Sequence, residues 1–400
     1  MKKNINNFLS IYLIILFFFS VFFLNEKHTV GNDSTISEWL INYEGGFTKR
    51  GLIGQIATYL AFFLKINLRE SILLMQVLLI LSYFFLIYKF FENLRIDRIM
   101  MLSIFTPIFL LYPVAEIEVL ARKEIFIFCI FLIALKIKKK IFRNINTILI
   151  LPIAILIWEP VVFFLPYFIA IDLINLKIFK LKEAFLKLIP IYLTSIILAV
   201  YIVLNPISME NHQIMSEFLK KEFNEVCYMS CALLKSKQTL YHQLEGNFGK
   251  YSFEVLLRYS LVILIGFGPL FYLLKNSKLR ERNIFLFKNF KNLLLPFLIF
   301  LSPIIILAAL GYDWYRWVNV GYFFSAILFY YLYKNNLIEF DNYKKKKFVK
   351  ILDNKKIFIA IFIIYCFSWN PKTVMTGDIA SFPGYRIPYK IFKIVNLKYL

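Results

Sequence analysis

The sequence predicts an all-α protein, a polytopic helical membrane protein with about 11 transmembrane helices and one interfacial helix on the outer side. Hydrophobic residues make up 60% of the 400-residue chain, and the mean hydropathy is +0.67, whereas the apolar share of soluble domains is nearer one half. The apolar residues form runs of roughly 15–22, about what a helix needs to cross a ~30 Å hydrocarbon core. The polar gaps are mostly short, so we expect residues 1–400 to form a single integral membrane domain.

The apolar runs define the predicted spans. These are 8–25, 70–91, 99–114, 124–137, 145–158, 161–175, 188–206, 253–275, 292–311, 316–334 and 356–369. The first span follows Lys2 and Lys3, as the apolar core of a signal peptide would. No small-x-small cleavage site comes after it, so we expect this helix to remain uncleaved.

Charge predicts the side of the membrane on which each segment lies. The net charge of +22 is concentrated in loops beside apolar runs, as the positive-inside rule predicts, and this argues against nucleic acid as a partner. If the run 52–66 crossed the membrane, the Lys136–Lys140 and Lys344–Lys347 clusters would face outward. We therefore assign 52–66 as an interfacial or re-entrant helix. The N-terminus is then cytoplasmic, and the large loop 207–252 and the C-terminal tail 370–400 are extracytoplasmic.

A short polar stretch, Asn42–Gly51, falls on the predicted outer side just ahead of the interfacial helix. Its Gly45-Gly46 pair would let backbone amides approach an anion closely. Lys49 and Arg50 offer a point charge and a planar fork, which suit phosphate oxygens. Glu44 is the associated candidate carboxylate. The alternative is that the two cations only extend to the lipid headgroups.

A second polar stretch, Ala115–Glu124, lies between two predicted spans and contains Glu116, Glu118, Arg122 and Lys123. If it is helical, Glu118 and Arg122 share one face at i, i+4, and the carboxylate can orient the guanidinium. Charges this dense at the end of a span are costly unless they are paired or solvated, so they indicate a functional site. A solvated loop cap is the alternative.

A third stretch, Gly311–Trp317, combines aromatic rings with Asp313 and Arg316 at i, i+3. Trp and Tyr alone would indicate only an aromatic belt at the interface. The charges add a carboxylate and a cation beside rings such as Trp314, which could stack on a sugar. A purely structural Asp–Arg pair is the alternative. Arg386 in the tail would join the site if the tail folds back over it, and an unstructured terminus is the alternative.

The remaining motifs restrict the chemistry. Cys227 and Cys231 lie four residues apart on the predicted outer loop, where an oxidising compartment permits a disulfide, but this spacing on a helix is near the upper part of the usual Cα range, so both states remain open. We find no HExxH, DxD or Cys/His cluster that would make a convincing metal site, and we expect no metal or other cofactor. Without a P-loop or a GxSxG motif, ATP-driven transport and serine hydrolysis have no support.

Cations and carboxylates at the outer rim suit an amphiphilic substrate whose diphosphate lies at the headgroup level while its tail stays in the bilayer. Sugars linked to a polyprenyl diphosphate fit this description. Transfer of the glycan needs a base to take a proton from an acceptor hydroxyl and positive charge to stabilise the leaving diphosphate. Carboxylates and arginines supply both without a metal.

The number of spans, the large outer loop and the outer arginines resemble the bacterial O-antigen and capsule repeat-unit polymerases, the Wzy-like integral membrane glycosyltransferases. The residues that carry the likeness are Gly45–Gly51, Arg122–Glu124 and Asp313–Trp317. The resemblance implies a protein of the bacterial inner membrane that transfers a growing glycan from undecaprenyl diphosphate to the next lipid-linked repeat unit on the periplasmic side. It also implies membrane lipids, a chain-length regulator and other polysaccharide-assembly proteins as partners.

The chemistry of the charged stretches gives their residues candidate roles. The candidate bases are Glu44, Glu116, Glu118 and Asp313, and the candidate substrate-binding residues are Lys49, Arg50, Arg122, Lys123, Trp314, Arg316 and Arg386.

Two alternatives remain. A GT-C-like, polyprenyl-phosphate-sugar-dependent glycosyltransferase is similar in carrying acidic residues in the first outer segment, where Asp33, Glu38 and Glu44 lie. A lipid-linked glycan flippase or other transporter is the non-enzyme alternative. It should have ionisable groups at mid-membrane, whereas Asp172 and Arg258 lie near the ends of their predicted spans.

Overall fold

The computed structural model describes residues 3–31, 34–137, 139–235, 241, 244–246, 252–281, 284, 286–311, 313–341 and 347–371. Asp33 and Arg386 therefore lie outside the described residues. The chain forms two compact units. Unit 1 consists of residues 1–5, 93–116 and 240–400, and unit 2 of residues 6–92 and 117–239.

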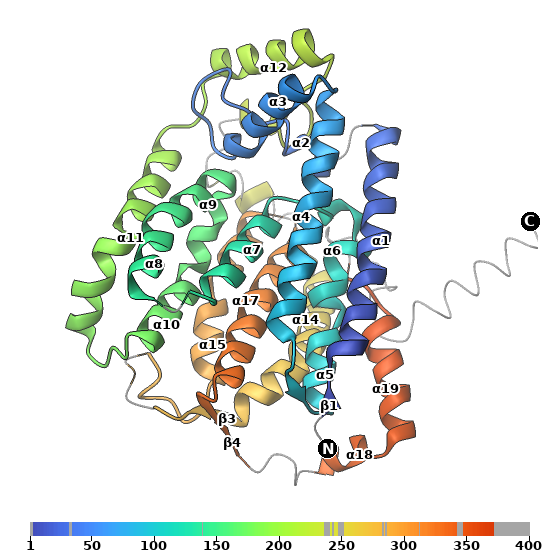
Figure 1. The fold of residues 1–400 in the computed structure, drawn as a ribbon, viewed down its shortest axis with the longest axis vertical. Helices are drawn as coiled ribbons and strands as arrows, with labels where there is room; N and C mark the ends of the chain where they lie inside the picture. The colour runs from blue at the N-terminus through green and yellow to red at the C-terminus, as the bar shows by residue number, and fades with distance from the viewer. Residues whose placement is uncertain are drawn as a thin grey trace, which may run out of the picture. The chain divides into compact units, whose positions relative to one another are not determined.

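Unit 2 is helical throughout its described elements (Figure 1). They are α1 (Asn6–Val30), α2 (Ser34–Ser37), α3 (Gly51–Leu64), α4 (Leu68–Phe91), the 3-10 turn η2 (Ile117–Val119), α7 (Glu124–Ala134), α8 (Lys140–Ile145), the π turn η3 (Asn146–Ile150), α9 (Leu151–Ile157), the 3-10 turn η4 (Glu159–Phe164), α10 (Leu165–Asn175), α11 (Leu181–Leu204), α12 (Met209–Phe223) and the 3-10 turn η5 (Ala232–Lys235).

Unit 1 is also mainly helical, with two short antiparallel ribbons that the sequence did not predict. Its elements are β1 (Lys3–Asn4), β2 (Arg95–Ile96), α5 (Arg98–Phe105), the π turn η1 (Pro107–Leu111), α6 (Tyr112–Ala115), α14 (Phe253–Lys275), β3 (Ser277–Leu279), α15 (Leu294–Leu301), α16 (Pro303–Leu310), α17 (Trp314–Lys334), β4 (Ile338–Phe340), α18 (Lys347–Leu352) and α19 (Lys355–Phe367). Strand β1 pairs with β2, with Lys3 opposite Ile96, and β3 pairs with β4, with Lys278 opposite Glu339.

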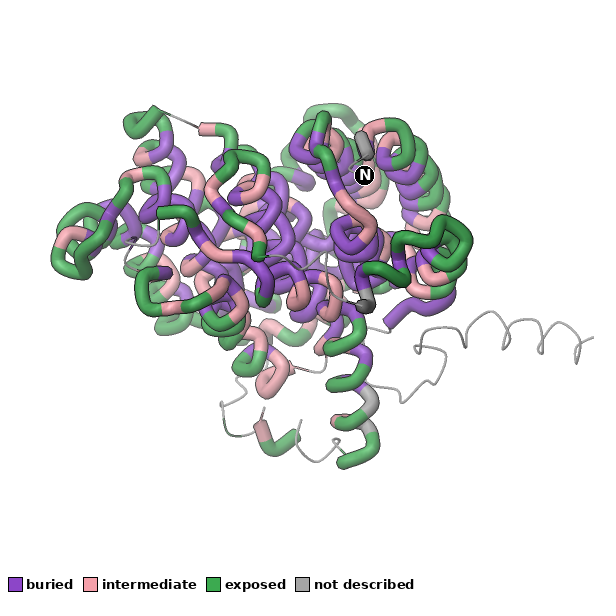
Figure 2. The backbone as a smooth tube through the Cα atoms, turned by 90° about the horizontal axis from the view of Figure 1, so that it is seen from below, coloured by how far each residue is buried: buried purple, intermediate pink, exposed green. Residues whose placement is uncertain are grey.

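Five helical segments within the described residues are long and apolar enough to cross a membrane: Asn6–Thr29, Leu68–Phe91, Arg98–Ala115, Lys140–Ile157 and Leu181–Leu204. They coincide with five of the predicted spans. The other predicted spans fall on shorter, interrupted or less apolar helices, so the total of eleven crossings stays a prediction. Large apolar side chains such as Phe18 and Val203 are exposed on these helices, as in a protein that meets lipid. Figure 2 shows that buried and exposed residues alternate along many of the helices of the backbone.

The polar stretch Asn42–Gly51 is followed in the chain by helices α3 and α4. Helix α4 begins with a capping box, in which the Asn67 side chain accepts from the Glu70 N–H and the Glu70 carboxylate accepts from the Asn67 N–H. Helix α3 has 14 residues and is about 21 Å long, shorter than the ~30 Å hydrocarbon core. In Figure 1, α3 and α12 run across one end of α4 rather than alongside it. This arrangement is compatible with the predicted interfacial helix.

In unit 1, α17 is almost entirely buried and supplies polar side chains to interrupted helices. The Asn319 Nδ2 group donates to the carbonyl oxygens of Ile108 and Phe109, at 2.8 and 3.0 Å. Both carbonyls lie in the π turn η1, where the regular helical ladder is broken beside Pro107. Because an unpaired carbonyl in a membrane is costly, Asn319 stabilises this break.

Candidate functional site

Glu38 is a fully buried carboxylate, directly after α2, that binds two arginines of unit 2. The Nη2 group of Arg122 donates to Glu38 Oε1, and Nη1 of Arg50 lies 3.6 Å from the same oxygen. A carboxylate with no exposed surface is stable only when it is paired. Glu38 therefore holds together two segments that are far apart in the chain.

Glu159 is the second carboxylate of the cluster and receives the fork of Arg50. Arg50 Nε donates to Glu159 Oε2 at 2.7 Å, and Arg50 Nη2 donates to Oε1 at 2.8 Å. Lys49 Nζ lies 3.9 Å from Glu159 Oε1. Burial raises the pKa of Glu159, but the charges of Arg50 and Lys49 outweigh burial and hold this pKa below its ordinary value. Glu159 is thus a carboxylate anion that fixes the direction of the Arg50 side chain.

Lys123 joins the cluster through the backbone. Its Nζ group is buried and donates to the Arg50 carbonyl oxygen at 2.5 Å. Arg50 itself has φ 62°, in the left-handed region that only glycine adopts readily, at the residue before α3. Non-glycine residues held in this region commonly mark functional sites, because the surrounding contacts must compensate for the strain. We name Glu38, Lys49, Arg50, Arg122, Lys123 and Glu159 the ion cluster.

The pKa of Lys123 provides a test of its burial. Burial is the largest cause that lowers this pKa, to about 7 from the ordinary 10.5, and Glu38 opposes the shift. Between these two values the unfolded chain binds the Lys123 proton and the folded chain does not. The free energy of unfolding should therefore rise with pH from 7 to 10.5, with a slope from this group of at most about 1.4 kcal/mol per pH unit.

This prediction is checked by thermal unfolding of the purified protein in detergent between pH 6 and pH 10. The variant Lys123→Met should lose the rise, whereas Lys65→Met, at an exposed residue after α3, should retain it. Equal pH slopes in the wild type and Lys123→Met would contradict a buried, largely neutral Lys123.

Gly45 permits a close backbone approach rather than an open loop. A Cβ atom at Gly45 would lie 1.9 Å from the backbone oxygen of Asn211 in α12. Gly46 has φ +100° and also faces Asn211. The described contacts of this pair are thus with α12, and its predicted role of presenting amides to an anion stays a prediction. The packing of α12 on this backbone is a sufficient reason for the two adjacent glycines in the sequence.

Replacing Gly45 with Ala should therefore lower the free energy of unfolding by about 1–3 kcal/mol, because α12 backbone would have to move. Gly268→Ala in α14 is a matched control, since a Cβ there meets nothing within 4 Å. Alanine in a helix is more stable than glycine by roughly 0.5–1 kcal/mol, so this control should be slightly stabilised. Thermal unfolding of both variants measures the difference. Equal midpoints would show that α12 does not lie on Gly45.

Glu44 lies at the edge of this region and is exposed. The Gln55 side chain donates to Glu44 Oε1 at 2.7 Å and accepts from the Tyr43 N–H at 2.7 Å. Gln55 therefore ties the polar stretch to α3 and orients the Glu44 carboxylate. Glu44 remains accessible to solvent as a candidate base.

The stretch 115–124 is not the helix that would have paired Glu118 with Arg122, and this part of the prediction was wrong. The backbone forms a short 3-10 turn at Ile117–Val119, and Ala121 has φ 55°, which ends any helical path. The Trp39 Nε1 group donates to the Ala121 carbonyl oxygen at 3.2 Å and stabilises the turn. As a result, Glu118 is exposed and Arg122 points to Glu38.

The remaining site candidates belong to unit 1. Arg316 Nη1 lies 3.3 Å from Asp313 Oδ2, and its guanidinium lies over the Trp317 ring at 5.2 Å. The Trp314 indole donates to the Ala308 carbonyl oxygen at 2.8 Å. Glu116 is buried at the end of α6. The predicted roles of these residues as base or substrate-binding groups stay predictions.

Two carboxylates of the ion cluster are difficult to recognise as site residues from the sequence alone. Glu38 is only one of several acids in the first predicted outer segment, and Glu159 is a single acid between Trp158 and Pro160. Their signal was the isolated position of a carboxylate between apolar residues on the predicted outer side. A further buried pair lies elsewhere in unit 2, where Arg143 Nε is 3.0 Å from Asp172 Oδ1 and the Tyr192 hydroxyl donates to Oδ2 at 2.8 Å.

Comparison of the chain with protein-family models, with curated proteins and with solved structures finds no match.

Proposed function

We propose that this protein transfers a glycan from undecaprenyl diphosphate to an acceptor sugar of a lipid-linked repeat unit, as a repeat-unit polymerase at the outer face of the inner membrane. The ion cluster carries the proposal. It gathers cations and carboxylates on the segment that charge distribution places outside, directly before a helix too short to cross the bilayer. These are the groups that departure of a diphosphate requires.

The accessible cations of the ion cluster favour an anionic ligand. Among the described residues, Lys49, Arg50 and Arg122 contact the carboxylates of Glu38 and Glu159, and Lys123 donates to the Arg50 carbonyl oxygen. Lys49 and Arg50 form the accessible side, with 49% and 19% of their side-chain surface exposed. Diphosphate oxygens would bind there and raise the protonated fraction of Lys123.

Two hydroxyl groups of the same stretch could hydrogen-bond to such a ligand. The hydroxyl oxygens of Tyr43 and Thr48 are buried and have no hydrogen-bond partner among the described residues. A buried polar group without a partner is costly, and such groups are often completed by a ligand or water. Burial raises the pKa of Tyr43 to about 12, so its hydroxyl stays protonated and can donate to a phosphate or sugar oxygen.

The surroundings suit the rest of the substrate. Helix α3 exposes Ile56, Tyr59 and Phe63, an apolar face beside which a polyprenyl tail can lie in the outer leaflet. Phe47 is partly exposed and packs on the rings of Tyr43 and Tyr201, at centroid distances of 6.0 and 5.3 Å. An aromatic face of this kind can stack on a sugar ring.

We assign the role of base to Glu44 within this proposal. It is exposed, it is oriented by Gln55, and it lies five residues from Lys49 in the same folded stretch. Glu38 and Glu159 are poorer bases because arginine pairing favours their charged forms. Glu116, Glu118 and Asp313 remain the other candidate bases.

A GT-C-like transferase that uses a polyprenyl monophosphate sugar is the second candidate. Glu38 favours it, since a carboxylate of the first outer segment lies at the centre of the ion cluster. In that case the ligand at Lys49 and Arg50 would carry one phosphate rather than two.

Deletion of the gene, followed by a gel of surface polysaccharide, tests the proposal. A single repeat unit attached to its acceptor, without longer chains, is expected for a polymerase. Complete loss of the unit would contradict this and favour an assembly transferase or a flippase.

A further inference from the structure

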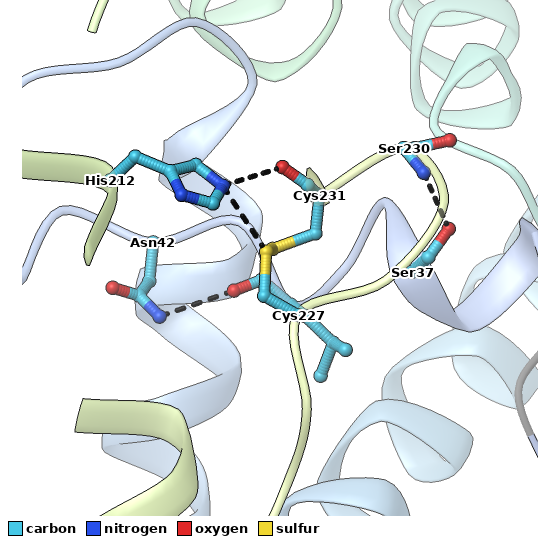
Figure 3. The surroundings of a disulfide bond; sticks show 7 residues. Ser37, Asn42, His212, Cys227, Ser230 and Cys231 are labelled. Carbon is cyan, nitrogen blue, oxygen red and sulfur yellow. Dashed lines mark hydrogen bonds between the residues drawn. A yellow bond between two sulfur atoms is a disulfide. The ribbon is translucent and has the colours of Figure 1, made fainter. Parts of the chain in front are cut away.

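The Cys227–Cys231 disulfide belongs to a segment that contacts Ser37, the residue before Glu38 of the ion cluster. Helix α12 ends at Phe223, Asn224 adopts the left-handed conformation, and residues 225–235 turn back toward α2. The two sulfurs are joined within this turn (Figure 3). His212, Cys227 and Cys231 lie within 4.8 Å of one another, but the sulfurs are bonded to each other and supply no thiolate to a metal in this state.

His212 ties α12 to the disulfide turn. Its buried Nε2 atom is 3.1 Å from the Cys231 carbonyl oxygen and 3.5 Å from Cys227 Sγ. The turn contains Met229 with φ 43°, a strained value for a residue that is not glycine. The disulfide joins Cys227, two residues before Met229, to Cys231, two residues after it, and holds the turn in this conformation.

The same segment is anchored on two other helices of unit 2. The Ser230 N–H donates to Ser37 Oγ at 3.3 Å, and Ser37 immediately precedes Glu38. The Arg69 guanidinium of α4 donates twice to the Glu225 carboxylate, at 2.5 and 3.0 Å. The disulfide turn therefore contacts Ser37, and the next residue in the chain is Glu38, at the centre of the ion cluster.

We propose that the Cys227–Cys231 disulfide is a redox-sensitive latch whose oxidised form holds the 225–235 segment on Ser37 and so keeps Glu38 in the ion cluster. Reduction frees the turn around Met229, releases Ser230 from Ser37, and loosens the 34–44 backbone. Control of glycan transfer by this latch rests on the proposed function, whereas the conformational change does not.

The reductant is a protein or small-molecule dithiol on the same side of the membrane. Its thiolate attacks Cys227 Sγ, since Cys227 is partly exposed and Cys231 is fully buried. The Cys227–Cys231 bond breaks, and Cys231 leaves as a thiolate that takes up a proton. The second thiol of the reductant then attacks the mixed disulfide and releases Cys227 as a thiolate, which is protonated in turn. The dithiol becomes a disulfide, and the latch gains two electrons and two protons.

Hydrogen exchange of the full-length protein in detergent tests the latch, with and without dithiothreitol. We expect the amides of residues 34–44 to exchange about tenfold faster after reduction, while those of α4 remain protected. The variant Cys227→Ser/Cys231→Ser should show the fast exchange without reductant and no further response to it. Cys129→Ser/Cys366→Ser, which removes the two free buried cysteines, should respond as the wild type does.

The variant Ser37→Ala tests whether the disulfide acts on residues 34–44 through the Ser230–Ser37 hydrogen bond. It removes the acceptor for the Ser230 N–H and leaves the disulfide intact. It should accelerate exchange at 34–44 in the oxidised protein. Unchanged exchange at 34–44 in the reduced wild type would overturn the latch, as would alkylation of both Cys227 and Cys231 in protein isolated without reductant. A polysaccharide gel of the same variants is read separately. Accelerated exchange with normal chain length supports the latch and counts against its control of the proposed polymerase.

Discussion

Replacement of Arg50 with Ala is expected to lower glycan chain extension roughly 10²–10³-fold, the usual loss when one preorganised donor to developing charge is removed. Arg50 is the residue that connects Glu38 and Glu159, and it lies beside Lys49 on the accessible side of the ion cluster. The measurement is the length distribution of surface polysaccharide on a gel, with an immunoblot of the membrane fraction to show that the variant is present. Arg122→Ala should have the same effect, since Arg122 shares Glu38 with Arg50.

Two further variants test whether the site needs the guanidinium geometry of Arg50 or only its positive charge. Arg50→Lys keeps the charge but loses the two-point fork on Glu159, so it should remain impaired. A residue that only extends to lipid headgroups would tolerate this change. Lys65→Ala removes an exposed cation at the far end of α3 and should leave the polymer unchanged. Normal-length polymer from Arg50→Ala and Arg122→Ala would refute the assignment of the site.

Replacement of Glu38 with Gln is expected to lower the free energy of unfolding by roughly 3–5 kcal/mol, the usual cost of removing one member of a buried ion pair. The change keeps the shape of the side chain but leaves two guanidinium groups around a neutral amide. Thermal unfolding in detergent measures the effect. The double variant Glu38→Gln/Arg122→Gln should be less destabilised than the sum of its single variants, because the first change has already removed the interaction.

Glu118→Gln is the matched control for this prediction, since Glu118 is an exposed carboxylate in a neighbouring turn of the same unit. A surface change of this kind should shift stability by no more than about 0.5 kcal/mol. A Glu38→Gln protein as stable as Glu118→Gln would show that Glu38 is not the buried centre of the cluster.

Local patterns in the sequence predicted the helices well and the ion cluster only in part. Lys49, Arg50, Arg122 and Lys123 were identified because cations are unexpected on the predicted outer side. The pairing of Arg122 with Glu118 was wrong, because it assumed that helical periodicity continues through Ala121, whose left-handed backbone ends it. No local pattern signals that a residue will leave the helical path in this way.

The true acidic partners lie far away in the sequence. Arg122 binds Glu38 across 84 residues, and Arg50 binds Glu159 across 109 residues. A spacing rule relates only neighbours on one helix or strand, so it cannot select between Glu38, Glu44, Glu116, Glu118 and Glu159. The fold makes that selection, because it brings Glu38 to Arg122 and Glu159 to Arg50.

The sequence by itself determined that the chain is a helical protein of membrane composition and that cations gather in the Asn42–Gly51 and Ala115–Glu124 stretches. These features could be predicted because the length of an apolar run and the charge of a short stretch depend only on residues that are neighbours in the sequence. Only the tertiary structure decided that Glu38 and Glu159 hold these cations, that α12 covers Gly45, and that the disulfide turn rests on Ser37. Those contacts arise because buried charges and backbone groups must find partners wherever the folded chain brings them together.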